Sequence, residues 1–326
     1  MKIFSLIFLA SVLLIFPQAQ QDSPELKEAS ALTESALKLF SEQKYDEALA
    51  NAKKALEIRE RVLPLTDPRV TASLVYVGDI YIVKRDYGDA KKVLERLLQI
   101  LAERTSAEDV SLAPTIERLA LVYYRQGDKR KSEEMYQRAL ASREKAFGAE
   151  SARVAHSLFT LAEFYRAEKD FERAASSYRR SLMIYGKLSG VGSPEYQDTS
   201  DGYICLGALN KKPQVYEDLK EIWKQFARQP EDESFGPKIL NGMAISLPKP
   251  EYPKEARDRN LSGTVVVKIW IDETGKVISA RDMCGGPPYL SQSCVASALK
   301  ARFTPTKLSG MPIKVSGVIQ YHFVRR

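Results

Sequence analysis

The chain has 326 residues, of which 44% are hydrophobic and 28% are charged, so it is long enough for two or three globular domains and too apolar for a disordered chain. Its 49 Lys and Arg residues outnumber its 42 Asp and Glu residues, which gives a net charge of +7. The basic residues are interleaved with acidic ones along the chain. Because phosphate binding requires clustered cations, this pattern argues against a nucleic-acid partner.

The first 20 residues have the composition of an export signal. Lys2 precedes a mostly apolar run over 3–16, and Ala19 supplies a small residue before a cleavage position. The run is shorter than the roughly 20 apolar residues that span a bilayer. We therefore predict a signal peptide over 1–20 and an exported protein. The alternative is that the segment is retained and anchors the chain to the membrane.

Residues 30–198 repeat themselves with a period of 42, which is typical of stacked helical hairpins. Each unit contains two helical patterns, and its small residues allow the two helices to cross closely. Asp67 and Pro68 have the pattern of a helix N-cap followed by a first-turn proline. We predict four helical hairpins over 30–198. The recurring positions are Leu32, Leu74, Ile116 and Leu158; Ala36, Gly78, Ala120 and Ala162; and Ala48, Ala90, Ser132 and Ala174.

These units resemble tetratricopeptide (TPR) repeats of the kinesin-light-chain-like variety, which have the same 42-residue period. The phrases Gly127-Asp128 and Arg138-Ala139-Leu140 carry much of the resemblance. It implies a helical solenoid whose groove binds an unknown protein. Members of the family often use asparagines in the first helix of each unit to bind a peptide backbone. Here those two positions hold Thr33 and Glu34, Val75 and Tyr76, Glu117 and Arg118, and Phe159 and Thr160.

The stretch 199–228 has the pattern of a shortened fifth helical pair, interrupted at 211–213. Because the last unit of a solenoid must cover an apolar face, we predict that this pair is a cap with Trp223 and Phe226 packed inward. The polar and acidic residues that follow indicate a linker over 229–247.

The region 248–326 has the pattern of a β-hairpin, a helix and a final strand. Four apolar residues alternate along the first strand, and 272–275 has the composition of a turn. Helical spacing is visible over 289–302, and a last apolar strand covers 314–324. We predict a three-stranded sheet with one helix across it. The core positions are Val265, Val267, Ile269 and Ile271 on the first strand, and Leu290, Cys294, Ala298 and Ala301 on the helix.

Five short motifs occur in order through this region, and together they resemble the C-terminal domain of TonB-like proteins. The resemblance implies a small α+β fold that contacts outer-membrane transporters from the periplasmic side. The predicted fold class is therefore an α-helical TPR solenoid followed by a small α+β TonB C-terminal domain. The motifs are P-x-Y-P-x-x-A (Pro250, Tyr252, Pro253, Ala256), G-x-V-x-V (Gly263, Val265, Val267), D-x-x-G-x-V (Asp272, Gly275, Val277), F-x-P (Phe303, Pro305) and G-x-P-I (Gly310, Pro312, Ile313).

A three-stranded sheet has one interior position, and the strand that begins at Gly263 is the better candidate for it. The final strand is then expected at an edge, where a partner's extended peptide can add by main-chain pairing. Trp270 falls on the face opposite the core, where it either packs against 248–262 or contacts a partner. The candidate partner-binding residues are Tyr252, Pro253, Val315, Val318, Ile319, Gln320, Tyr321 and Phe323.

No pattern indicates catalysis. The two histidines, His156 and His322, lie far apart, and the sequence has no phosphate-binding loop, dinucleotide-binding glycine motif or zinc-ligand spacing. We predict a protein without enzymatic activity, cofactor or metal site.

Two of the three cysteines, Cys284 and Cys294, lie ten residues apart at a strand-helix junction. In an exported protein they are candidates for a disulfide, and the alternative is two separate buried thiols. Cys205 is predicted to be a small core residue.

Together with the resemblance to TonB-like proteins, these patterns predict a periplasmic, non-catalytic adaptor. It would bind the N-terminal segment of an outer-membrane transporter by strand addition and transmit energy for transport. The alternative is a TPR scaffold for protein interactions in the cell envelope that transduces no energy. The location is predicted to be the periplasm, or the inner membrane facing the periplasm if the N-terminal segment is retained.

Overall fold

The computed structural model describes residues 23–103, 109–210, 214–226, 244–308 and 310–324. The predicted signal peptide 1–20 and most of the predicted linker 229–247 lie outside these residues. The chain divides into two compact units, Met1–Ala149 and Glu150–Arg326. Within the described ranges, no helix combines the length and apolarity needed to cross a membrane.

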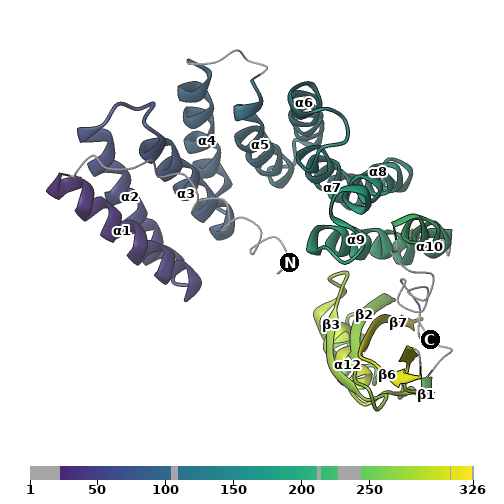
Figure 1. The fold of residues 1–326 in the computed structure, drawn as a ribbon. Helices are drawn as coiled ribbons and strands as arrows, with labels where there is room; N and C mark the ends of the chain where they lie inside the picture. The colour runs from purple at the N-terminus through teal and green to yellow at the C-terminus, as the bar shows by residue number, and fades with distance from the viewer. Residues whose placement is uncertain (1–22, 104–108, 211–213, 227–243, 309, 325–326) are drawn as a thin grey trace. The chain divides into compact units, whose positions relative to one another are not determined.

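The first unit consists of helical hairpins that follow one another in chain order (Figure 1). Each predicted repeat forms two antiparallel helices joined by a short turn, and a short 3-10 turn precedes the third pair. The elements are α1 (Pro24–Ser41), α2 (Tyr45–Val62), α3 (Pro68–Lys84), α4 (Tyr87–Ala102), η2 (Val110–Leu112), α5 (Ala113–Arg125) and α6 (Lys129–Phe147).

Capping residues set the start of several helices. Asp67 is the N-cap of α3, as predicted, and its carboxylate accepts a hydrogen bond from the Arg69 N–H at 2.8 Å. Asp128 and Asp170, which are 42 residues apart, cap α6 and α8 in the same way. The 42-residue repeat therefore also includes the N-cap residues of the helices.

The small residues of the repeat lie where paired helices cross. Ala36, Ala120 and Ala162 are fully buried. At Gly78, a Cβ atom would lie 2.9 Å from Leu94 Cδ2, which is closer than carbon atoms normally approach. A larger side chain at this position would therefore push α3 away from α4.

The second unit begins with four helices: α7 (Ala152–Ala167), α8 (Phe171–Ser189), α9 (Pro194–Asn210) and α10 (Gln214–Phe226). The pair α9 and α10 occupies the stretch predicted as a cap. Trp223 is buried, and the Phe226 ring packs over Gly186 so closely that a Cβ atom there would overlap it. Both aromatic residues thus pack inward, as predicted.

The C-terminal part of this unit contains a three-stranded antiparallel sheet in the order β3-β2-β7, so the predicted edge position of the final strand is confirmed. Helix α12 covers one face of the sheet (Figure 1). The elements are β1 (Ala244–Ser246), α11 (Lys254–Asp258), β2 (Gly263–Ile271), β3 (Val277–Asp282), α12 (Pro288–Ala298), β4 (Arg302–Phe303), β5 (Lys307–Leu308), β6 (Met311–Pro312) and β7 (Val315–Phe323).

The core between the sheet and α12 contains the residues predicted from alternation and helical spacing. All eight predicted core residues are at most 3% exposed. The turn between β2 and β3 needs Gly275, which has φ +85° and whose missing Cβ would lie 1.9 Å from the Phe303 carbonyl oxygen.

The predicted disulfide between Cys284 and Cys294 is wrong. Cys284 is bonded to Cys205 of α9, with 5.4 Å between their Cα atoms. Cys294 is a free thiol, because α12 turns it into the core against the sheet, where it is fully buried. The loop that carries Cys284 is held by Asp282, whose carboxylate accepts hydrogen bonds from the N–H groups of Cys284 and Gly286.

Candidate partner-binding site

The outer edge of β7 is defined by the register of the sheet. β7 pairs with β2 along its whole length, from Val315 opposite Ile271 to Phe323 opposite Gly263. The Met283 N–H donates to the Val266 carbonyl, so the even-numbered residues of β2 direct their backbone groups toward β3. The odd-numbered residues of β2 therefore bond to their odd-numbered partners in β7.

This register directs the backbone groups of Ser316, Val318 and His322 to the outer edge of β7. Among the described strands, none pairs with that edge. Unpaired N–H and C=O groups along a strand are a template for another extended chain. The edge thus has the geometry for strand addition.

The side chains predicted to bind a partner divide between the two faces of the sheet. Val315, Ile319, Tyr321 and Phe323 belong to the core beneath α12, and burial raises the pKa of Tyr321 to about 12. Val318 is buried on the opposite face. Contact between β7 and an added strand would therefore rest mainly on main-chain hydrogen bonds.

Tyr252 and Pro253 have structural contacts within the domain. The Tyr252 hydroxyl donates to the Leu261 carbonyl at 2.5 Å, and its ring lies edge-on to Phe323 with 5.4 Å between centroids. Pro253 is the N-cap residue of α11. The two residues thus fix the α11 segment beside the end of β7.

The face of the sheet opposite α12, here called the second face, carries Val266, Lys268 and Val318, all of them buried. Lys268 is only 9% exposed, and its Nζ lies 2.7 and 2.8 Å from the two carboxylate oxygens of Asp201 in α9. Arg281 of β3 donates to the same carboxylate at 3.0 Å. The second face is thus covered by the helical pair that precedes the sheet.

Three more contacts involve this face or its edge. The Gln320 side chain donates to the Tyr216 hydroxyl of α10, and Cys284 is bonded to Cys205 of α9. The Trp270 ring lies within 6 Å of both the Lys268 ammonium and the Arg281 guanidinium, a distance that permits cation–π attraction. Sequence reasoning missed this arrangement, and the one local signal for it is a lysine in a strand of valines and isoleucines.

Asp198 lies one helical turn before Asp201 on α9. Burial and the nearby Asp201 carboxylate raise the pKa of Asp198, against the attraction of Arg281 and Lys268. Two carboxylates and two cations therefore share this contact.

Family models match three stretches of the chain. Models described as tetratricopeptide repeat match residues 29–69 and 111–187, and one described as Gram-negative bacterial TonB protein C-terminal matches residues 248–324. The chain carries TPR repeats followed by a TonB C-terminal domain. Protein TonB of Vibrio cholerae serotype O1 is 35% identical over 66 residues, which are 20% of this chain and 27% of that protein. The match thus spans about a quarter of the curated relative.

Solved structures match the helical part. Two structures of the nearly identical TPR-like repeats of a Podosopora anserina protein described as a kinesin light chain have TM-scores of 0.52 and 0.50. They are 19% and 18% identical, and they cover 62% and 64% of this chain and 95% and 100% of their own chains. At this identity the likeness shows the fold: a mostly helical TPR-like solenoid, followed here by the TonB C-terminal domain.

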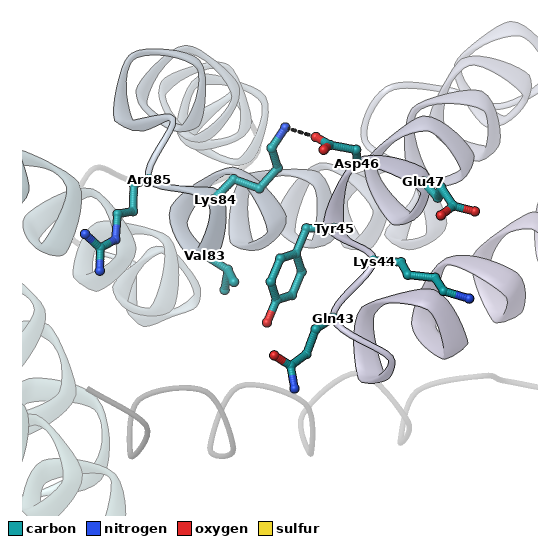
Figure 2. A pocket seen from close by; sticks show the side chains of 8 residues that line it. All are labelled: Gln43, Lys44, Tyr45, Asp46, Glu47, Val83, Lys84 and Arg85. Carbon is teal, nitrogen blue, oxygen red and sulfur yellow. Dashed lines mark hydrogen bonds and ion pairs between the residues drawn. The ribbon is translucent and has the colours of Figure 1, made fainter. Parts of the chain in front are cut away.

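One open pocket lies in the TPR repeats, at the turn between α1 and α2 and the end of α3. Figure 2 shows Lys84 reaching toward Asp46, with which it forms an ion pair. Across the ranges that the structure describes, no group of three or more potential metal ligands is present. The pocket has no paired nucleophile and base, and its lining is Gln43, Lys44, Tyr45, Asp46, Glu47, Val83, Lys84 and Arg85.

Proposed function

We propose that the chain is an exported periplasmic adaptor whose TonB C-terminal domain binds the extended N-terminal segment of an outer-membrane transporter. The segment adds as a fourth strand along the outer edge of β7, and the TPR repeats bind a second protein. The observation that carries the proposal is the edge position of β7, a nine-residue strand paired on its inner side alone among the described strands.

Strand addition suits this edge for two physical reasons. Main-chain pairing supplies affinity without requiring exposed side chains. This suits β7, in which Val318, Ile319, Tyr321 and Phe323 are buried. β7 is also long enough to offer several outward donors and acceptors, so a short peptide can form a continuous ladder.

Energy transduction to the transporter is the more specific form of this proposal. A scaffold that transduces no energy is the second candidate, and one observation favours it. A disulfide and two ion pairs join the TonB C-terminal domain to α9, so the domain is held close to the preceding helices instead of at the end of a long spacer.

The test is calorimetric titration of the full chain with synthetic peptides copied from the N-terminal segments of the host's outer-membrane transporters. Proline removes a backbone donor, and an edge strand tolerates it where that donor faces outward. We expect Ser316→Pro or Val318→Pro to weaken binding at least tenfold. Ser316→Ala keeps the donor at an exposed position and should bind within about twofold of wild type.

Circular dichroism establishes first that each variant is folded. If wild type binds none of the peptides, or if both folded proline variants bind as tightly as wild type, strand addition at β7 is the wrong mechanism. The scaffold function would then replace it.

A further inference from the structure

Asp198, Asp201 and Cys205 form a stripe on one face of α9, because residues three and four apart in a helix are neighbours on its surface. In the 42-residue register, Asp201 occupies the position of Thr33, Val75, Glu117 and Phe159 in the four earlier units. The TonB C-terminal domain contacts this stripe through Lys268, Arg281 and Cys284.

The contact has one covalent bond, the buried side chains of Val266 and Val318, and a set of polar interactions. The Asp201 carboxylate lies between the Lys268 ammonium at 2.7 Å and the Arg281 guanidinium at 3.0 Å. If the two surfaces separated, these three charged groups would become solvated. Because a buried ion pair gives up the hydration of both charges, its net contribution to stability is small, so the covalent bridge is the strongest single link in this contact.

Each side of the contact also has a core of its own. The core beneath α12 includes Cys294 but neither bridged cysteine. On the other side, Ser181 of α8 bonds to the Ala155 carbonyl of α7, and Tyr178 of α8 packs against Tyr203 of α9. Opening the bridge would therefore leave both cores intact.

We propose that the Cys205–Cys284 disulfide is a thiol-sensitive latch that holds the TonB C-terminal domain on the stripe of α9 formed by Asp198, Asp201 and Cys205. When a dithiol reductant opens it, the domain leaves α9 and uncovers Asp201 and Lys268. The latch determines whether the domain and the last helical pair act as one body. It also determines whether the stripe is accessible to another protein.

Reduction of the bridge by thiol–disulfide exchange proceeds in two steps. Cys205 is 3% exposed and Cys284 is half-buried, so a reductant thiolate attacks the sulfur of Cys284. The disulfide breaks, a mixed disulfide forms on Cys284, and the Cys205 thiolate takes up a proton. The second thiol of the reductant then displaces the Cys284 thiolate, which is protonated, and the reductant leaves as a disulfide.

The test measures the rate at which Lys268 is acetylated in the full chain. The oxidised chain is compared with a chain that has been treated with dithiothreitol and then desalted. Lys268 is protected by Asp201 while the latch is closed, and it should react at least tenfold faster once the bridge is open. Lys276, which is exposed on the same hairpin, is the internal control and should react at an unchanged rate. Cys205→Ser should reproduce the reduced chain without any reductant.

The buried thiol of Cys294 reports whether the domain stays folded. If the bridge acts as a latch, iodoacetamide should leave Cys294 unlabelled in the native reduced chain. Lys268 should become reactive toward acetylation in the same chain. An unchanged Lys268 rate after reduction would overturn the proposal, because the domain would then remain docked without the bridge. Labelling of Cys294 together with Lys268 would also overturn it, because the domain would then need the bridge in order to stay folded.

Discussion

Asp67 shows how one side chain supports a repeat. Its carboxylate accepts from the Arg69 N–H at 2.8 Å and pairs with the Arg69 guanidinium at 3.0 Å. The hydrogen bond from the Arg69 side chain lowers the pKa of Asp67 against the opposing effect of burial. A carboxyl group whose pKa is lower in the folded chain stabilises the fold above its unfolded pKa, and that stabilisation is lost as pH falls through the folded value.

Replacing Asp67 with alanine removes the cap of α3, and we expect a loss of about 1 kcal/mol in unfolding free energy at neutral pH. Asp67→Asn is the matched control, because asparagine also caps helices but does not titrate. Urea unfolding of the two variants and wild type at pH 7 and pH 3 makes the comparison. If Asp67→Asn is as destabilised as Asp67→Ala at pH 7, the capping bond is not what stabilises this turn.

At the scale of elements, the close crossing of α3 and α4 depends on the absence of a side chain at Gly78. We expect Gly78→Leu to overpack the contact with Leu94 and to cost roughly 1–3 kcal/mol. Gly88 lies on α4, and a Cβ there would meet nothing within 4 Å. Gly88→Leu is therefore the control, and it should leave the melting temperature unchanged or raise it. Equal melting temperatures for Gly78→Leu and wild type would contradict the crossing described here.

Elements with a strong period were predictable from the sequence. The edge position of β7 followed from the number of strands in the sheet. The 42-residue repeat identified the hairpins and their small positions, and alternation identified the buried face of β2. Both signals are local, because they record which face of an element meets its nearest neighbour. Cys294 was likewise predictable as a core residue from its spacing to Leu290 and Ala298.

What the sequence did not reveal is the contact on the second face of the sheet. Alternation assigns Lys268 to a solvent-facing position, since a charged residue opposite a core normally faces water. Its burial depends on Asp201, 67 residues earlier, and no local pattern encodes that pairing. The disulfide prediction was wrong for the same reason, because the partner of Cys284 is Cys205 on α9 and not the nearer Cys294.

At the scale of the whole molecule, two kinds of module are present in one chain. TPR repeats provide surfaces for proteins, and the TonB C-terminal domain provides a strand edge. The Cys205–Cys284 bridge and the ion pairs of Lys268 and Arg281 with Asp201 join the TonB C-terminal domain to α9. A mechanical force applied to β7 would therefore be transmitted directly to α9.

The most direct test of the account is residue-resolved amide hydrogen exchange of the chain with and without a bound transporter peptide. An added strand on β7 would accept hydrogen bonds from the outward N–H groups of Ser316, Val318 and His322, so we predict slower exchange at these three amides. The outer edge of β3, which includes Ile278 and Ala280, should exchange as in the free chain. Protection of β3 instead of β7, or binding that leaves both edges unprotected, would contradict the account.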